Sequence, residues 1–341
     1  MKERKVFRLL ESPNCPRDSG ARLTAGFGRV NYPSVSQQHA IPSLNSMNFL
    51  PRFSIASARL LKRSTIISVP VSLQLTRMAS TPAAKRQKSS KDVPYELIYW
   101  PGIPGRGEHI RLALEEAGAT YTDSAHQKDG INSVLSQIDA KNLGDASNPP
   151  PLAPPILKHG DLLISQTSNI LMYLAPRLGL VPSAEEDEDA IYKINALALT
   201  ALDGLSNEPH DCHHPVATSL YYEDQKTESK RKSQDYIANR LPKFLGYFER
   251  VLQGEASKGG KWLYGGNFTY ADLVLYQCLD GVKFAFPNAT KRIEKEGKFG
   301  KVFELHRAVQ ERPKIKEYLA SERRQKYSQG IYRHYPELDE E

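Results

Sequence analysis

The chain has 341 residues, which suits about two domains, and its formal net charge is +7. Residues 1–91 hold sixteen of the 46 Lys and Arg but only three of the 39 Asp and Glu, which leaves 30 basic and 36 acidic residues for the rest. An acidic body argues against a nucleic-acid-binding fold. Three distant cysteines without a CxxC pair exclude a disulfide framework and a zinc ribbon, and they fit a reducing compartment.

Residues 1–91 are expected to form a disordered leader or a targeting segment, because Ser19–Lys91 contains no Asp or Glu and is rich in Ser, Arg and Pro. From Met47, apolar and arginine residues fall on different faces of a helix, as in a mitochondrial presequence. A start at Met78 would give a cytosolic protein. We expect a cytoplasmic location, with the mitochondrion as the alternative if translation starts at Met47. The apolar stretch Thr65–Leu75 is short and contains a proline, so no membrane span is expected.

The first folded element is expected to be a strand that ends at Tyr99. Tyr95, Leu97 and Tyr99 fall on one face, β-favouring residues dominate, and the Pro-Gly pair after Trp100 cannot continue a ladder. A helix is predicted for residues 108–118, where apolar residues recur at helical spacing. A tyrosine hydroxyl is therefore expected at a strand end just before a helix N-terminus, where a rigid scaffold can hold a functional loop.

Residues 93–178 are expected to form one domain with the order β-α-β-loop-β-β-α. A strand is predicted over Thr120–Asp123, and two more over Ile156–Lys158 and Leu162–Ile164, joined by a tight turn. A helix should follow Ser165, where several Ser, Thr and Asn residues offer a cap.

Residues 182–321 are expected to form an all-helical domain. The pattern Ser183 to Glu186 predicts a capping box ahead of a long Ala-rich helix. A second helical stretch, residues 226–252, should be kinked or divided by Pro242. Another capping box, with Thr269 as N-cap and Asp272 at the third helical position, should start a core helix. The tail, residues 322–341, is expected either to fold over the cleft between the domains or to be disordered.

These features resemble the glutathione S-transferase family, and in particular its tyrosine-type (sigma, alpha, mu and pi) members, with the look of a fungal member that carries an N-terminal extension. In those members a Tyr at the end of the first strand precedes an aromatic residue, a Pro, a short loop and an Arg of the first helix. The corresponding residues here are Tyr99, Trp100, Pro101 and Arg106. The resemblance covers residues 93–178 throughout and implies a thioredoxin-like α/β domain followed by an all-α domain.

The resemblance also implies a glutathione site. Pro155 stands where the family keeps a cis-proline, and Gln166-Thr167 match a Gln-Ser pair that, with the following helix N-terminus, holds the γ-glutamyl carboxylate. Simple helix capping is the alternative role for that pair. Pro154 departs from the pattern, since the family's residue there bonds the cysteinyl part of glutathione through N–H and C=O, and Pro has no N–H. Losing one such bond costs about 1 kcal/mol, so we expect several-fold weaker binding or an altered pose.

Residues 208–215 contain three histidines and a cysteine, which suggests metal ligands. A metal is nevertheless disfavoured, because adjacent ligands rarely point at one ion and no distant set completes the site. His210 and His213 are instead candidates for lining the cleft that takes the electrophile, and a solvated helix end is the alternative.

The resemblance implies a glutathione transferase that joins the glutathione thiolate to a small hydrophobic electrophile, with glutathione as co-substrate and no metal. Tyr99 would donate a hydrogen bond to the thiolate, which is the nucleophilic form of the sulfur. Arg106 would add positive charge or orient the loop, and Trp100 would wall the electrophile pocket. A glutathione-dependent isomerase or peroxidase, or a non-catalytic binding scaffold, are the alternatives. A homodimer is expected by resemblance only.

Overall fold

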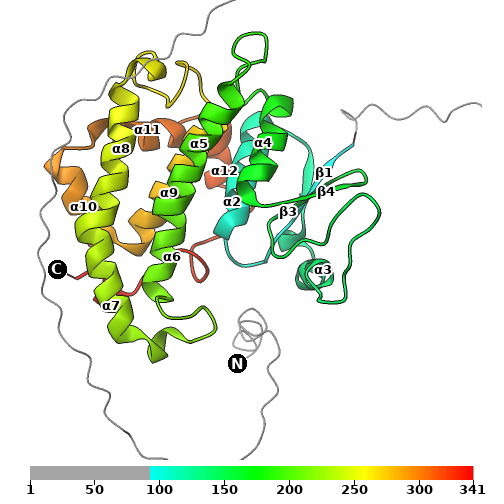
Figure 1. Cartoon of the computed structure of the whole chain (residues 1–341), viewed down its shortest axis with the longest axis horizontal. Helices are drawn as coiled ribbons and strands as arrows, with labels where there is room; N and C mark the ends of the chain where they lie inside the picture. Colours follow the sequence, from blue (N-terminus) through cyan, green and yellow to red (C-terminus); the bar gives the residue numbers. More distant parts are fainter. Residues whose placement is uncertain (1–92, 341) are drawn as a thin grey trace, which may run out of the picture. The chain divides into compact units, whose positions relative to one another are not determined.

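The computed structural model describes residues 93–340 (Figure 1). The predicted leader, residues 1–91, and its targeting alternatives lie outside the described residues. Within the described part, no helix is both long and apolar enough to cross a membrane.

The described chain has two parts, called here the α/β half (residues 93–178) and the helical half (residues 179–340). The α/β half is built on a four-stranded mixed sheet with the strand order β2-β1-β3-β4. Its strands are β1 (Tyr95–Ile98), β2 (Tyr121–Asp123), β3 (Ile156–His159) and β4 (Leu162–Ser165), and its helices are α2 (Glu108–Ala117), α3 (Gly130–Gln137) and α4 (Thr167–Leu178). β1 runs parallel to β2 and antiparallel to β3, which pairs antiparallel with β4. Apolar residues of α2 and α4 pack on one face of the sheet, and Val134 of α3 packs on the other.

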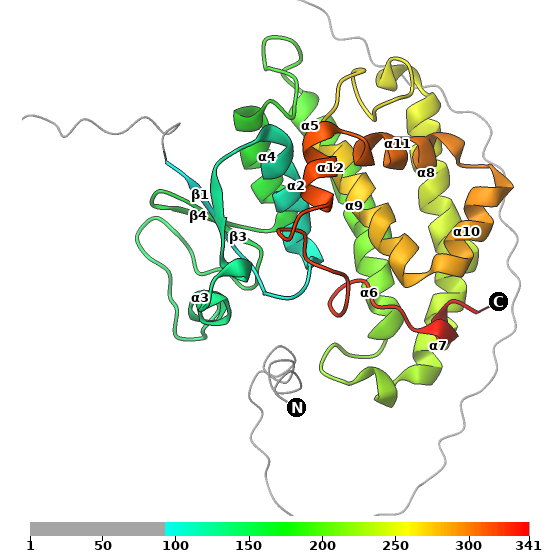
Figure 2. The same cartoon turned by 180° about the vertical axis from the view of Figure 1, so that it is seen from behind.

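The second half of the chain is helical. Its helices are α5 (Ala190–Leu202), α6 (Glu208–His213), α7 (Lys226–Asp235), α8 (Leu241–Gln253), α9 (Tyr270–Ala285), α10 (Pro287–Glu296), α11 (Gly300–Gln310) and α12 (Pro313–Leu319). The central helix is α9, which is buried along most of its length and packs against α5, α11 and α2 (Figure 2). The fold class predicted from the sequence, an α/β half followed by an all-helical half, is confirmed.

The capping box predicted before α9 is present. Thr269 N donates to Asp272 Oδ2 at 2.7 Å, and the carboxylate also accepts from Leu263 N at 2.8 Å. The box predicted at Ser183 forms only in part: Ser183 N donates to Glu186 Oε2 at 2.9 Å, but the helix α5 begins seven residues later, at Ala190.

Two π turns interrupt the long helical segments. Asp203–Asn207 joins α5 to α6, and Tyr236–Arg240 joins α7 to α8. Pro242 is the second residue of α8, so the π turn lies directly before the proline predicted to divide this stretch. The first π turn places Asp203 and Asn207 at the candidate site.

The tail from Glu322 to Glu340 packs on the helical half, and its Arg324 also pairs with Glu108 of α2. Of the two alternatives expected from the sequence, the structure shows the folded one. Figure 2 shows it running from α12 past α6 toward α7. Tyr332 is 2 % exposed and its hydroxyl donates to Leu205 O at 2.8 Å. Asp339 accepts bonds from Asn288 N and Ala289 N at 2.7 and 3.0 Å and thereby caps α10.

Candidate active site

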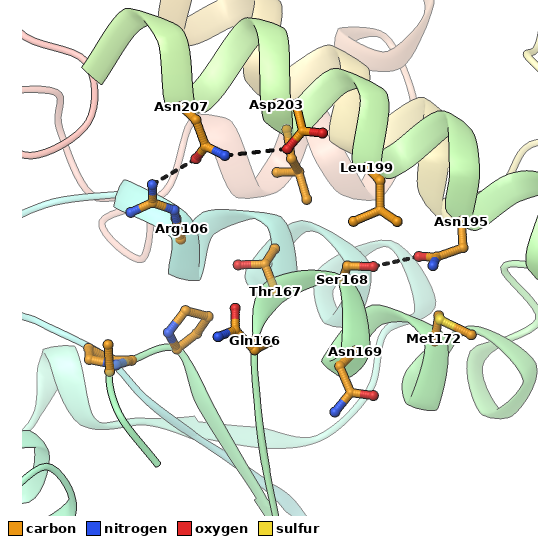
Figure 3. Close-up of a pocket in the computed structure, with 14 residues that line it drawn as sticks. Arg106, Gln166, Thr167, Ser168, Asn169, Met172, Asn195, Leu199, Asp203 and Asn207 are labelled. Atoms are coloured by element: carbon orange, nitrogen blue, oxygen red, sulfur yellow. Dashed lines mark hydrogen bonds between the residues drawn. The ribbon is translucent and has the colours of Figure 1, made fainter. Parts of the chain in front are cut away.

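Two neighbouring cavities lie where the α/β half meets α5, α6 and the tail. The first, of about 580 Å³, is called here the α4 cavity because the start of α4 lines it (Figure 3). The second, of about 250 Å³, is called the Tyr99 cavity. Arg106 lines both cavities. The residues that line the α4 cavity are Arg106, Ala153, Pro154, Pro155, Gln166, Thr167, Ser168, Asn169, Met172, Asn195, Leu199, Leu202, Asp203 and Asn207.

The structure divides the predicted site residues between these cavities. Pro154, Pro155, Gln166 and Thr167 come together with Arg106 around the α4 cavity. The Tyr99 cavity brings a different set together, and its lining residues are Tyr99, Trp100, Ile103, Arg106, His210, His214, Thr218, Gly330, Ile331 and Arg333. Arg106 is therefore the residue that the linings of the two cavities share.

The loop between β1 and α2 closes tightly over the Tyr99 ring. A Cβ atom on Gly105 would lie 2.2 Å from Tyr99 Oη, and one on Gly107 would lie 2.6 Å from Tyr99 Cγ. Gly105 also has φ +48°, a conformation that favours glycine. Both glycines are needed so that the backbone can approach the phenol.

The Tyr99 hydroxyl accepts a hydrogen bond but has no acceptor for its own proton among the described residues. Arg106 N donates to Tyr99 Oη at 2.8 Å, and the side chain is 5 % exposed. Burial raises the pKa of Tyr99 above its ordinary value of 10.0, and the nearby Arg106 opposes this only in part. The phenol therefore stays protonated at neutral pH and can donate to a group in the Tyr99 cavity.

Buried groups fix the backbone at the end of the strand. Ser124 Oγ accepts from Tyr99 N at 3.0 Å and donates to Tyr99 O at 3.1 Å. Arg111 lies 5.6 Å from the centre of the Tyr99 ring and donates to Pro104 O at 3.1 Å. Arg111 is in turn held by Asp123, with 2.6 Å between Nε and Oδ2. This second layer limits how far the phenol can move.

Arg106 is a cation without an acidic partner in the described part of the chain. Its Nη2 donates to Asn207 Oδ1 at 2.9 Å, which links the first loop to the π turn after α5 (Figure 3). The group that holds the guanidinium is a neutral amide, which itself donates to Asp203 Oδ1 at 3.5 Å, so Asp203 is linked to Arg106 only through Asn207.

The start of α4 offers donors to the α4 cavity. Gln166, the residue before the helix, has φ +74°, which is strained for a side-chain-bearing residue, and its side chain makes no capping bond. Thr167 is 5 % exposed, and its buried Oγ1 has no hydrogen-bond partner among the described residues. An orphaned hydroxyl beside the first N–H groups of a twelve-residue helix suits an anionic ligand. The Pro154-Pro155 peptide bond beside it is cis.

His210 and His213 of α6, and His214 directly after it, lie in different surroundings. His210 and His214 line the Tyr99 cavity, whereas His213 is 2 % exposed and its Nε2 bonds to Ile331 O at 2.9 Å. The structure thus does not bring His213 to the cavity surface. Burial, with a contribution from nearby Arg333, lowers the pKa of His213 to about 2 and that of His214 to about 4. Residues 93–340 contain no group of three or more His, Cys, Asp or Glu that could hold a metal ion.

The sequence analysis missed several lining residues. Asp203 and Asn207 are spaced like one helix face, and this spacing was an available signal. Nothing local marks Arg333, because only the folding of the tail brings it to the Tyr99 cavity.

Comparisons with known proteins point to one family. Residues 210–322 match the model of the glutathione S-transferase C-terminal domain. A glutathione S-transferase of Dirofilaria immitis is 29% identical over 228 residues, which cover 66% of this chain and 92% of that protein. Glutathione S-transferase P 1 of Xenopus laevis is 28% identical over 239 residues, covering 68% and 94%. A solved pi-class glutathione S-transferase of Onchocerca volvulus has 26% identity and a TM-score of 0.47, covering 66% and 91%.

Proposed function

Because the chain belongs to the glutathione S-transferase family, we propose that it conjugates glutathione to a small electrophile and that Tyr99 stabilises the reacting thiolate. The observation that carries the proposal is the Tyr99 hydroxyl, which accepts from Arg106 N, has no acceptor for its own proton among the described residues, and belongs to a side chain that lines the Tyr99 cavity.

In this proposal glutathione occupies the α4 cavity. Gln166, Thr167 and the first N–H groups of α4 take its γ-glutamyl carboxylate, and the bond supplies a partner for the orphaned Thr167 hydroxyl. The carboxylate of Asp203, across the same cavity, suits the ammonium group of the γ-glutamyl residue. The sulfur then lies toward Arg106, the residue common to both cavities, and the electrophile enters the Tyr99 cavity.

The energy required fits these groups. A free thiol has a pKa of about 8.5, so only a small fraction is ionised at neutral pH. Lowering that pKa by about two units requires roughly 2.7 kcal/mol of preferential binding to the anion. A hydrogen bond to a charged acceptor contributes about 1.5–3 kcal/mol, so the Tyr99 proton supplies most of it, and the uncompensated Arg106 charge adds to it.

The reaction needs no other catalytic group. The thiol releases its proton to water, the thiolate attacks the electrophilic carbon, a C–S bond forms, and the leaving group departs with its electron pair. Tyr99 holds the sulfur as an anion until the bond forms and retains its own proton.

Pro154 weakens the same site in this proposal. It lines the α4 cavity but has no N–H, so the cysteinyl backbone of glutathione loses one of two bonds. The net loss of about 1 kcal/mol corresponds to several-fold weaker binding than in a relative with another residue there. The family likeness also makes a homodimer the assembly that we propose.

The test compares wild type with Tyr99→Phe. The ultraviolet absorbance of the bound thiolate, titrated against pH, should show a thiol pKa well below 8.5 in wild type and a rise of about two units in the variant. Tyr121→Phe is the matched control, because its hydroxyl donates to Glu115 at 2.8 Å and lines neither cavity.

An unchanged thiol pKa in Tyr99→Phe would refute the role of Tyr99. A wild type that does not bind glutathione would favour the non-catalytic scaffold. Parallel assays with chloronitrobenzene, hydroperoxide and isomerisable substrates separate the transferase from the peroxidase and isomerase alternatives.

A further inference from the structure

Resting on the proposed transferase function, we propose that His210 is a catalytic proton donor in the Tyr99 cavity, and that the second substrate is an α,β-unsaturated carbonyl compound. Addition of a thiolate to such a compound generates an enolate, which must take up a proton. Displacement of a leaving group such as chloride takes up no proton. A proton donor in the cavity therefore serves the addition reaction and has no task in the displacement.

Of three neighbouring imidazoles, His210 is the one with both ring nitrogens free. It lines the cavity, its side chain is 23 % exposed, and neither ring nitrogen makes a hydrogen bond to another residue in the described part of the chain. The other two rings are bonded to the protein. His213 Nε2 bonds to Ile331 O at 2.9 Å, and Gln225 Nε2 donates to His214 Nδ1 at 3.3 Å. The His210 ring can thus offer an N–H to a ligand.

The ring of His210 is positioned by the two imidazoles beside it. Its centroid lies 5.0 Å from that of His213, with 68° between the ring planes, and 5.2 Å from that of His214. Both neighbours are buried and hydrogen-bonded, and burial lowers their pKa to about 2 and about 4, so both are neutral at pH 7. The partial exposure of His210 lets water return a proton to it after each turnover.

The other titratable and charged groups around His210 do not replace it as a proton donor. Arg106 of the first loop and Arg333 of the tail line the cavity, but a guanidinium does not give up its proton in a protein. Burial raises the pKa of Tyr99, and its proton is committed to the sulfur in the proposed function. Asp211 Oδ1, 3.8 Å from His210 Nδ1, is a carboxylate oxygen and acts as an acceptor.

The proposed addition balances in atoms and charge. The thiol has released its proton to water, and the thiolate attacks the β-carbon so that a C–S bond forms. The electron pair of the C=C bond moves toward the carbonyl group and gives an enolate. His210 transfers its N–H proton to the α-carbon, and the ring takes a proton back from water. General acid catalysis of this kind contributes about 10²–10⁴-fold to the rate.

The size and surface of the cavity suit a small aryl enone. About 250 Å³ holds one aromatic ring with a short unsaturated side chain. Trp100, Ile103 and Ile331 supply apolar surface for the ring. The addition probe is 4-phenylbut-3-en-2-one, and the displacement probe is 1-chloro-2,4-dinitrobenzene, from which chloride leaves with the electron pair of the C–Cl bond.

The experiment measures kcat and KM for both probes in wild type, His210→Gln and His126→Gln. Glutamine keeps an N–H donor but does not release a proton, so kcat for the enone should fall about 100-fold in His210→Gln, whereas kcat for the chlorodinitrobenzene should change little. Added imidazole should restore turnover of the enone in His210→Ala. His126→Gln is the matched control, because its side chain is 39 % exposed and lines neither cavity, and it should leave both kcat values unchanged.

An equal loss with both probes would overturn the proposal, since it would show that His210 only packs or positions, and so would an unchanged kcat for the enone. A second measurement needs no variant. In wild type, D₂O should slow turnover of the enone by a larger factor than turnover of the chlorodinitrobenzene, and equal factors would contradict proton donation. A wild type that conjugates the chlorodinitrobenzene but not the enone would overturn this inference and leave the transferase function standing. A wild type that conjugates neither would contradict the transferase function itself.

Discussion

Replacing Arg324 with methionine should destabilise the protein strongly, because ion pairs of this arginine join the tail to α2 of the α/β half and to α9. Its Nη1 lies 2.6 Å from Glu108 Oε1, and its Nη2 lies 3.3 Å from Asp280 Oδ2. The side chain of Arg324 is 11 % exposed, that of Glu108 is fully buried, and that of Asp280 is 21 % exposed. Methionine keeps most of the side-chain length and removes the charge.

The size of the effect follows from what remains around the two carboxylates. Glu108 keeps Arg111 at 3.1 Å and the Tyr318 hydroxyl at 2.8 Å, so it is not fully orphaned. Removing one member of a buried ion pair typically costs about 3–5 kcal/mol. Because the other partners stay in place, we expect the lower end, about 3 kcal/mol of unfolding free energy.

Urea unfolding at pH 7.5, followed by tryptophan fluorescence, measures this loss. The control is Arg323→Met at the adjacent position. Arg323 pairs with Glu115 at 3.0 Å, but its side chain is 49 % exposed, so its loss should cost less than about 1 kcal/mol. If the two variants lose the same small amount, buried charges do not anchor the tail and the reasoning is wrong.

Two further predictions concern the glutathione site and pH. Pro154→Val restores an N–H at the α4 cavity, so calorimetry should show several-fold tighter glutathione binding, and an unchanged Kd would mean that this amide makes no contact. Burial lowers the pKa of His109 to about 3 and that of His213 to about 2, so both are neutral in the folded protein. Unfolding restores a pKa of about 6.5, so each histidine takes up a proton, and stability should fall as pH drops below about 6, by up to about 3 kcal/mol per pH unit for the pair. Urea unfolding at pH 7.5, 6.5 and 5.5 measures this slope, and a His109→Leu variant with an undiminished slope would contradict it.

The fold could be predicted because its signals are local. Pro and Gly residues end the strands, and the Thr269 and Asp272 pair marks the start of α9. The helix α3 was missed because only Ile131, Val134 and Leu135 give it an apolar pattern over eight residues. The start of α5 was predicted too early, since a capping sequence at Ser183 closes a turn there without starting the helix.

The candidate site was only partly predictable because long-range packing completes it. His210, His213 and His214 have spacings that put all three near one side of a helix. Which of them reaches a cavity depends on the tail, because the Ile331 carbonyl of the tail forms a hydrogen bond with His213. The position of Arg333 depends on the same packing, and no periodicity near it in the sequence reports this.

The two cavities have different proposed roles, and their walls come from different parts of the sequence. The loop from Tyr99 to Gly107 and the start of α4 are close to the sheet, which holds them rigidly, and under our proposal they bind glutathione and activate its sulfur. The second wall of the Tyr99 cavity comes from the tail, which is held by Arg324 at one end and by Asp339 at the other. Under the same proposal, changes between these two anchors should alter the choice of electrophile without moving the groups that ionise the thiol, whereas loss of an anchor should affect stability and electrophile binding together.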